Sequence, residues 1–402
     1  MTLAELSRFL ISPVTLVLYT VSMLVYLWAM AVSVDRADGE VAGRRGRVAA
    51  TSLAILGVGA HLGHIVTRSM ASDRLPLGNM FEFSSVVALT AVVAGLLVFQ
   101  WRMRRPEVMG FVLLGTIITI GVSFLVYAEP GPLAPILDSW WRAIHVSTIA
   151  LAAGVFTVGA VFNALHLLRE TAERRVAADS GRFTGSTVGA AYAGGTTTGR
   201  AEDETTDRHV DDLAERENPE ESLDLDTPDR HDAAYRRALR ASLTQRWLGV
   251  TFPWRIALWN ALAFAAFGLV FQEARAIVGM GLTGFLFIAI SWWALPYLPS
   301  ASTLDSLAYR TIAFGFPIWT FAVITGAIWA EQSWGRYWGW DPKETSAFLT
   351  WVAYAGYLHA RATRGVRGRG ASWLGIGSFV VLMFTYFVVN LLITGLHSYA
   401  GL

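Results

Sequence analysis

Apolar residues occur along this chain in long, nearly uncharged runs, separated by short segments in which charged and small polar residues gather. Most runs are about twenty residues long, the length that an α-helix needs to cross a hydrocarbon core of ~30 Å. A helix satisfies its own backbone hydrogen bonds inside lipid, so each run predicts a membrane-spanning helix. The predicted spans are residues 14–34, 48–70, 83–101, 109–128, 145–168, 254–272, 276–296, 310–330, 345–362 and 371–394.

Composition supports this pattern. The chain is 54% hydrophobic and only 16% charged, and its mean hydropathy of +0.44 is too high for a water-soluble protein of this size. We therefore predict an all-α, polytopic integral membrane protein with about ten transmembrane helices. The first run has no basic leader and no small-residue cleavage site, so it predicts a retained span. Cysteine is absent, which excludes disulfides, thiolate metal sites and catalytic thiols within this chain.

Arginine-rich loops predict how the helices are oriented. Short loops with several arginines lie at residues 44–47, 102–105 and 361–369, and the positive-inside rule places such loops in the cytoplasm. Counting spans from these loops puts both chain termini on the outer side of a bacterial cytoplasmic membrane. The other segments predicted on that side are 71–82, 129–144 and 331–344.

One segment interrupts the apolar pattern. Residues 169–253 are rich in Gly, Thr and Ser and then in mixed acids and arginines, which predicts a disordered cytoplasmic insert. The chain then divides into four parts: N-terminal membrane helices that include the first external histidine (1–168), the insert (169–253), an additional helix pair (254–303) and the helices around a tryptophan-rich loop (304–402).

The tryptophan-rich loop, WGRYWGWDPKET (334–345), lies between two predicted spans on the outer side. Its second half is a good helix start, with Asp341 as N-cap, Pro342 at the first helical position and Glu344 reaching back to the cap. This structural role explains the Asp-Pro-Lys-Glu sequence without any ligand.

The first half of the loop needs another explanation. Trp and Tyr gather at membrane interfaces on physical grounds, but such belts are usually scattered over several helices. Here Trp334, Tyr337, Trp338 and Trp340 fall in one loop, spaced by glycines that allow the backbone to approach a neighbour closely. Large flat apolar ligands bury well against aromatic faces. The loop therefore indicates a planar ligand, of which haem is the commonest at a membrane surface.

Two histidines fit a haem on that side. His145 follows a Trp-Trp pair at the start of the fifth span, and His397 closes the last span, so both are predicted on the side of the tryptophan-rich loop. Two neutral imidazoles on separate helix ends, one on each side of a porphyrin plane, form a bis-His axial site. Either histidine alone is also explained as an interfacial residue; their convergence on the loop favours iron ligation.

Cations near the loop are candidates for the haem propionates. Arg336 and Lys343 lie in the loop, and Arg142 precedes His145 by about one turn, so each is placed to pair with a carboxylate. Each is explained equally well as an ordinary interfacial cation. Asn79 and Glu82 stand at a helix start on the same side, where capping explains them.

Several motifs together resemble one family. The tryptophan-rich loop resembles the WWD signature of the haem-handling membrane proteins of cytochrome c maturation, and its DPKET ending is similar to the CcsA/ResC type of system II. The other segments that resemble this family are RLPLGNMFEFSS (74–85), LDSLAYRTIAFGFP (304–317), YLHAR (357–361) and NLLITGLHSY (390–399). The resemblance covers most of the chain outside 169–300.

The resemblance implies a function. Members bind haem (b-type, as a bound substrate), present it on the outer membrane face and, with a membrane partner of the ResB/Ccs type, attach it to Cys-x-x-Cys-His of apocytochrome c. The chain would then be the haem-handling subunit of a cytochrome c synthase (haem lyase) complex. By position, His145 and His397 correspond to the external iron ligands, and Asp341 belongs with the tryptophans to the haem-binding signature.

The remaining histidines are weaker candidates. The resemblance makes His359, near the inner end of its span, an axial ligand for haem that enters from the cytoplasmic side. The opposite ligand is expected from the partner protein, and His166, also near an inner helix end, is an alternative within this chain. His61 and His64 are three residues apart on one helix and point roughly the same way, so they cannot clamp a porphyrin. A packed, hydrogen-bonded role or a proton path is expected for that pair.

Two other functions compete with this hypothesis. A b-type cytochrome subunit of an electron-transfer complex keeps its haem permanently, but such subunits tend to carry histidines two to four turns apart within one span, and no span here has such a pair. A secondary transporter for another aromatic anion is expected to show repeat symmetry and broken helices, and neither is evident.

Overall fold

The computed structural model describes residues 1–35, 39–102, 108–132, 139–180, 252–271, 274–295 and 298–396. The chain forms two units: Met1–Glu170 together with Phe252–Leu402, and Thr171–Thr251. Of the second unit, only the last turns of one helix belong to the described residues. The first unit carries every site discussed below.

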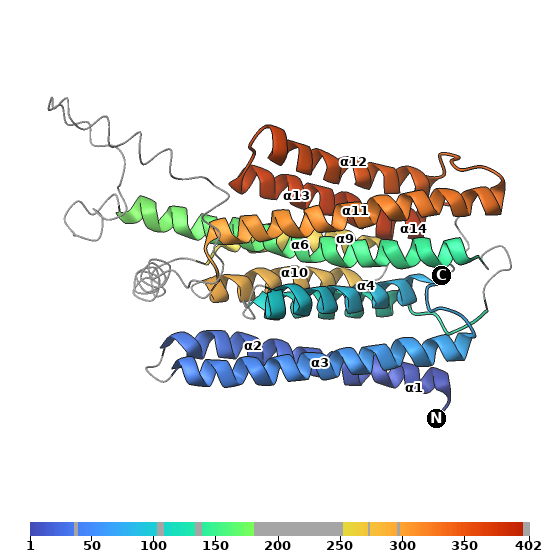
Figure 1. The fold of residues 1–402 in the computed structure, drawn as a ribbon. Coiled ribbons are helices and arrows are strands. Elements are labelled where there is room, and N and C mark those ends of the chain that lie inside the picture. The colour runs from blue at the N-terminus through green and yellow to red at the C-terminus, as the bar shows by residue number, and fades with distance from the viewer. Residues whose placement is uncertain are drawn as a thin grey trace. The chain divides into compact units, whose positions relative to one another are not determined.

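The described residues of both units form helices, turns and irregular segments, without a strand, which confirms the all-α prediction (Figure 1). The first half contains α1 (Leu3–Phe9), η1 (Leu10–Thr15), α2 (Leu16–Asp35), α3 (Gly39–Ser72), α4 (Met80–Gly95), η2 (Leu96–Arg102), α5 (Met109–Ser123), η4 (Phe124–Val126) and α6 (Trp140–Ser180). The second half contains α9 (Trp254–Gly268), η6 (Leu269–Phe271), α10 (Ala274–Ala294), α11 (Ala301–Trp334), α12 (Pro342–Thr363), α13 (Gly368–Met383), η8 (Phe384–Val389) and α14 (Asn390–Leu392).

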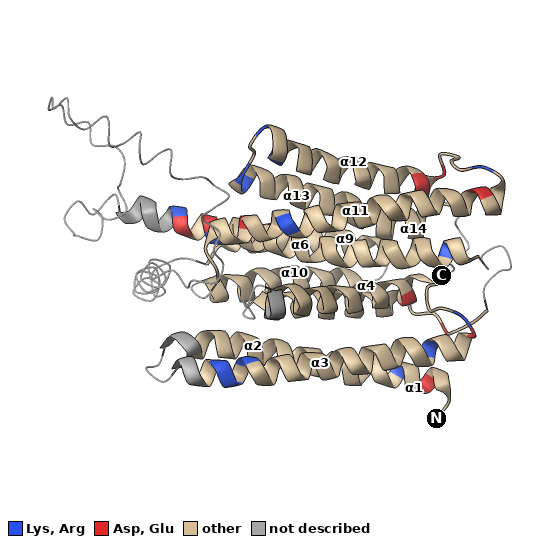
Figure 2. Ribbon diagram, viewed as in Figure 1, with Lys and Arg blue, Asp and Glu red and all other residues tan. Residues whose placement is uncertain are grey.

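Nine helical stretches of the described residues are long and apolar enough to cross a membrane, which confirms a polytopic membrane protein. These stretches are Leu3–Val32, Ala42–Ser72, Met80–Phe99, Met109–Val126, Trp140–Arg174, Trp254–Phe271, Ala274–Ala294, Ala301–Trp334 and Gly368–Leu392. The predicted span 345–362 is a helix, α12, but it is not among the nine because serine, threonine, histidine and arginine interrupt its apolar sequence. Figure 2 shows that the charged residues of the described helices gather toward the helix ends.

Several helices extend beyond their predicted limits: α3 begins at Gly39 rather than 48, α11 begins at Ala301 rather than 310, and the first helix and α6 are also longer. The first begins at Leu3 rather than near 14, because Thr2 and Glu5 form a capping box and Pro13, which lacks an N–H, is accommodated in the π-helical segment η1. Helix α6 continues to Ser180, so the predicted boundary of the insert at 169 lies inside a helix. The rest of that insert, from 181 to 251, lies outside the described residues.

The helices around the site pack through aromatic rings and one close approach of backbones. Phe156 of α6 stacks on Tyr354 of α12, with ring centroids 3.7 Å apart, and also contacts Trp319 of α11. A Cβ atom added at Gly154 of α6 would lie 2.9 Å from the carbonyl oxygen of Val87, so a glycine is needed where α6 crosses α4. These contacts fix α4, α6, α11 and α12 around a common core.

A second cluster joins the start of α4 to the end of the chain. Its buried members are Met80, Val126, Tyr386 and Phe387. Phe267 of α9 and Phe271 of η6 contact Phe387 edge to face, with ring centroids 4.8 Å and 5.8 Å apart. The additional apolar pair at 254–296 therefore forms two helices, α9 and α10, of which α9 and the following η6 contact the π-helical segment η8 through aromatic rings.

Candidate functional site: a cavity beside the tryptophan-rich loop

A cavity of about 210 Å³ lies where five segments meet. They are the turn before α4, the first turns of α6, the last turns of α11, the tryptophan-rich loop with the start of α12, and the end of α13 with η8. The polar and aromatic side chains of the lining are Asn79, Phe83, Arg142, His145, Trp319, Trp329, Tyr337, Trp338, Lys343, Glu344, Thr385, Tyr386 and Asn390. Residues far apart in the sequence thus form one site.

The cavity brings together only part of the predicted site. His145, Tyr337, Trp338 and Lys343 line it, as does Arg142. The predicted residues of the tryptophan-rich loop that are not among its lining are Trp334, Arg336, Trp340 and Asp341. The sequence did not distinguish Tyr337, Trp338 and Lys343 from these four, because all seven residues belong to the same short loop.

Trp340 and Trp334, which do not line the cavity, each contact a tryptophan that does. Trp340 is 69% exposed and meets Trp338 edge to face, with ring centroids 5.8 Å apart. Trp334 lies 5.2 Å from Trp329, which itself lines the cavity. Arg336 is exposed in the loop. The first and last tryptophans of the loop therefore act on the cavity through another aromatic ring.

The loop is held by hydrogen bonds at both ends. Gly335 caps the end of helix α11 with a φ of +68° and donates its N–H to the Glu331 carbonyl at 2.7 Å. Helix α12 starts with the predicted capping box, because Asp341 accepts from the Lys343 N–H at 3.3 Å and Glu344 accepts from the Asp341 N–H at 3.2 Å. The structural interpretation of the Asp-Pro-Lys-Glu sequence is confirmed.

Trp340 has an unusual backbone for a bulky residue. Its φ of +57° lies in the left-handed region, which costs a non-glycine residue on the order of 1–3 kcal/mol. The N–H groups of its two neighbours, Gly339 and Asp341, both donate to one oxygen of Glu344, at 2.8 Å and 3.2 Å. The carboxylate of Glu344 therefore holds this conformation from both sides, and Trp340 points outward instead of into the cavity.

His145 is oriented by helix α11. Its Nδ1 lies 2.7 Å from the Ala322 carbonyl oxygen, and its ring stacks on Trp329 at 6.0 Å with an interplanar angle of 30°. A carbonyl oxygen only accepts, so Nδ1 carries the hydrogen and the lone pair of the neutral imidazole is on Nε2. A metal-binding histidine commonly has this arrangement, in which one ring nitrogen donates to a backbone carbonyl and the other ligates.

His397 lies outside the described residues, and the chain before it is tied to the loop. The N–H of Leu396 donates to Oδ1 of Asp341 at 2.6 Å. Asp341 is 5% exposed, so this bond is made away from water. The buried carboxylate of Asp341 therefore links the start of α12 to the residue that precedes His397.

The two histidines predicted at the other end of the bundle differ in environment. His359 is exposed on α12, whereas His166 of α6 is 2% exposed and its Nδ1 lies 2.9 Å from the Ser372 hydroxyl of α13. His166 is thus part of the α6–α13 contact, and His359 belongs to the surface of α12.

His61 and His64 are both fully buried in α3. His61 lies 2.8 Å from the Ser85 hydroxyl and 3.3 Å from the Tyr19 hydroxyl, and His64 donates from Nδ1 to the Ser7 carbonyl at 2.9 Å. The packed, hydrogen-bonded role expected for the pair is confirmed.

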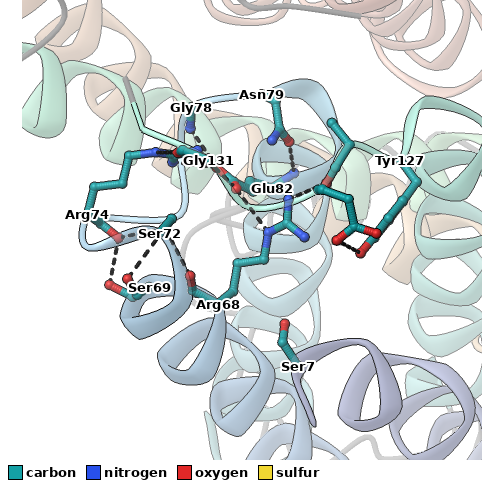
Figure 3. A network of polar contacts seen from close by, with 12 residues as sticks. Ser7, Arg68, Ser69, Ser72, Arg74, Gly78, Asn79, Glu82, Tyr127 and Gly131 are labelled. Carbon is teal, nitrogen blue, oxygen red and sulfur yellow. Dashed lines mark hydrogen bonds and ion pairs between the residues drawn. The ribbon is translucent and has the colours of Figure 1, made fainter. Parts of the chain in front are cut away.

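Glu82 forms a network that the sequence did not reveal, shown in Figure 3. Glu82 is fully buried and accepts from Arg68 Nε at 2.9 Å, from Arg74 at 2.7 Å and 3.2 Å, and from the Gly78 N–H at 2.8 Å. Asn79 caps α4 as expected, since its Oδ1 accepts from the Glu82 N–H at 2.9 Å. Capping alone therefore does not account for Glu82, which holds the turn that forms one wall of the cavity.

Two cations contribute to the cavity. Arg142 is 7% exposed and donates to the Leu77 carbonyl at 3.3 Å, so the turn before α4 positions it. Burial lowers the pKa of Lys343, at the start of α12, to about 8, against the opposing effect of the nearby Asp341 carboxylate. An anionic group in the cavity would offset this burial, because it favours the charged ammonium.

The fold and the cavity define a multi-pass helical membrane protein with an aromatic-lined cavity that contains one oriented imidazole and two cations. Comparison with known proteins shows the family to which this membrane protein belongs. The family described as Cytochrome C assembly protein matches residues 77–397. The chain belongs to this family and is of the CcsA type, a group of cytochrome c biogenesis proteins.

Individual relatives carry the name Cytochrome c biogenesis protein CcsA. The protein from Gloeobacter violaceus is 30% identical over 358 residues, which cover 88% of this chain and 86% of that protein. The proteins from Microcystis aeruginosa and Trichormus variabilis are 54% identical over 102 residues, or 25% of this chain. Those matches span only 31% and 29% of the two proteins' lengths.

Proposed function

We propose that this chain binds haem as a substrate in the cavity, presents it at the outer membrane face and, with a membrane partner of the ResB/Ccs type, attaches it to Cys-x-x-Cys-His of apocytochrome c. The orientation of His145 carries the proposal. Its Nδ1 donates to the Ala322 carbonyl, so the lone pair is on Nε2, the nitrogen that would ligate iron, and the ring is part of the cavity lining.

The other residues of the cavity also fit haem. Tyr337, Trp338 and Trp329 offer aromatic faces to a flat apolar ring system. Arg142 and Lys343 are cations in the same lining, as two acidic propionates require. Arg336 lies nearby in the loop and is our third candidate for a propionate. Trp334 contacts Trp329, and Trp340 contacts Trp338, so each supports a ring of the cavity lining. Asp341 caps the start of α12, which carries Lys343.

A second axial ligand is assigned to His397. Asp341 fixes the backbone of the preceding residue, Leu396, against the start of α12, which carries Lys343 of the cavity lining. With His145 on one side and His397 on the other, the iron would be held by two imidazoles until the histidine of the apocytochrome displaces one of them.

The attachment reaction depends more on the positioning of haem relative to the thiols than on acid–base groups. Each thiol S–H of the apocytochrome adds across a vinyl C=C of haem: sulfur bonds to the carbon next to the ring, and hydrogen goes to the terminal carbon. Atoms and electrons balance without an oxidant or reductant. The thiols come from the substrate, which suits a chain without cysteine. The contribution of this chain is to hold the vinyl edge in register with the thiols.

His359 is proposed as an axial ligand for haem on its way from the cytoplasmic side. Because His359 is exposed on α12 while His166 contacts Ser372 of α13, a ligand from the partner protein fits better opposite His359 than His166 does. His166 remains the weaker, in-chain alternative.

The proposal is tested by the optical spectrum of the protein purified with its partner. We expect a six-coordinate, low-spin haem spectrum that is lost in the His397→Ala variant while the protein remains folded. Protein that carries no haem, under conditions in which it matures cytochrome c, would contradict the proposal.

Haem affinity is expected to fall between pH 7 and pH 10. The pKa of Lys343 is about 8 in the free protein, and a bound propionate raises it, so the contribution of Lys343 is complete below pH 8 and is lost as pH rises through the pKa of the complex. Each unit between the two pKa values is tenfold in affinity, which gives a loss of about 10- to 100-fold. Haem titrations across this range measure it.

Two variants serve as controls for this pH dependence. Lys343→Arg keeps the charge throughout and should give a flat profile, whereas Lys343→Met should bind weakly already at pH 7. A wild-type profile as flat as that of Lys343→Arg would exclude Lys343 as a propionate partner.

The tryptophans of the loop should differ in importance. Trp338→Ala removes a ring from the cavity lining and should weaken haem binding by about tenfold or more, since 1.4 kcal/mol corresponds to a factor of ten. Trp340→Ala removes an exposed ring that contacts Trp338 only edge to face, and its effect should be smaller. Haem content of the purified variants measures both; equal losses, or none, would contradict the assignment of the platform to Trp338.

A further inference from the structure

Helix α11 presents three residues to His145 from a single helical face. Ala322, Gly326 and Trp329 are spaced by four and three residues, so they follow one another along the same side of the helix. Ala322 accepts the Nδ1 hydrogen of His145 at 2.7 Å, and Trp329 stacks on the imidazole ring. Gly326, the residue between them, determines whether the His145 imidazole fits against the helix.

Gly326 leaves that room because it has no side chain. A Cβ atom added at Gly326 would lie 2.5 Å from Cε1 and 2.6 Å from Nδ1 of His145, and 3.3 Å from Nε2. Distances below 3 Å are not tolerated, so the imidazole would have to leave its place over the helix. Any such movement also breaks the bond from Nδ1 to the Ala322 carbonyl, which determines the tautomer.

The first tryptophan of the loop belongs to the same arrangement. Trp334 contacts Trp329 at 5.2 Å, and Trp329 contacts His145 at 6.0 Å. The three rings therefore form a continuous series of contacts from the loop to the histidine, tilted at 60° between the two tryptophans and stacked between Trp329 and His145. This gives Trp334 a role although it is not among the residues that line the cavity.

We infer that Gly326 is a positioning residue for the iron ligand. Because Gly326 has no side chain, the His145 imidazole can pack against the Ala322 carbonyl and Trp329. These two contacts fix which ring nitrogen ligates iron and where that nitrogen lies. The inference rests on the proposed function, because it assigns a role to Gly326 through His145 as a haem ligand.

The test compares Gly326→Ala with a matched glycine. Gly356 lies in α12, and a Cβ atom added there meets nothing within 4 Å, so Gly356→Ala should leave haem binding unchanged. Alanine is the better helix former, and neither substitution is expected to weaken its helix by itself. Gly326→Ala should lower haem retention at least tenfold and replace the low-spin spectrum of the remaining haem with a high-spin one.

A double-variant cycle shows whether Gly326 acts through His145. If the added methyl group only displaces the imidazole, Gly326→Ala should have no further effect on haem retention in a His145→Ala background. Free imidazole should restore the low-spin spectrum of Gly326→Ala by occupying the vacated coordination position. Additive losses in the double variant would indicate a general packing defect and overturn the inference.

The spectra also separate this inference from the proposed function. An unchanged spectrum in His145→Ala would overturn the proposed function itself. A spectrum that changes in His145→Ala but not in Gly326→Ala would overturn the role of Gly326 alone.

Discussion

Replacing His145 with alanine should remove most of the haem from the cavity and abolish cytochrome c maturation. Among the described residues of the cavity lining, His145 is the only histidine, and its 2.7 Å bond to Ala322 holds it in the tautomer that the proposed iron ligation requires. Removing a group that merely orients a metal ligand typically lowers affinity by about 10- to 100-fold, so removing the ligand should cost at least that much. Haem content and the yield of holocytochrome, by haem stain, measure the effect.

Added imidazole should distinguish this variant from one at the other proposed ligand site. In the proposed function the site of His145 opens to an incoming apocytochrome, so a small imidazole from the medium should enter and restore maturation. We expect weaker rescue of His359→Ala, because that histidine is proposed to bind haem earlier, on its way from the cytoplasmic side. Equal rescue of the two variants, or rescue of His359→Ala alone, would contradict the proposed direction of haem movement.

Replacing Glu82 with alanine should destabilise the protein strongly. Glu82 is fully buried and is paired with both Arg68 and Arg74, so its removal leaves two guanidinium groups without their shared carboxylate. Breaking a buried ion pair in this way costs about 3–5 kcal/mol. Thermal unfolding of the purified protein in detergent, followed by tryptophan fluorescence, should show a large fall in the melting temperature.

Glu5 offers a matched control for Glu82. Its carboxylate is exposed and, within the described part of the chain, accepts only from the Thr2 N–H, in a capping box that glutamine can also form. Glu5→Gln should therefore leave the melting temperature nearly unchanged, whereas Glu82→Gln should fall between wild type and Glu82→Ala. A Glu82→Ala variant as stable as Glu5→Gln would show that the buried network does not hold the turn before α4.

Local features of the site could be predicted from the sequence, because each depends on neighbours in the chain. The start of α12 is an example: Asp341, Pro342 and Glu344 form a capping box that any solvent-accessible helix start would favour. The apolar runs likewise predicted the helices, because a helix satisfies its own backbone hydrogen bonds inside lipid. The side of α12 that faces the protein was not predictable, because its polar residues interrupt the apolar pattern.

Unusual backbone geometry and long-range contacts account for what the sequence did not reveal. Trp338 and Trp340 are two residues apart, and only the left-handed backbone at Trp340 turns one ring toward the cavity and the other away. Glu82 resembled an ordinary first-turn carboxylate until the fold brought Arg68 of α3 against it. Gly326 gave no signal at all, because its role depends on His145, far away in the chain and on another helix.

Transfer of haem to an apocytochrome is the most direct test of the account. The protein is purified with its partner and its bound haem, and a reduced apocytochrome c that contains Cys-x-x-Cys-His is added. The absorption of the pyridine haemochrome then follows the conversion of vinyl groups to thioethers. We expect haem to leave the protein and to appear covalently bound on the cytochrome in equal amount, and not in the His145→Ala variant. Haem that stays on the protein with both vinyl groups intact, as in a permanent b-type cytochrome, would contradict it.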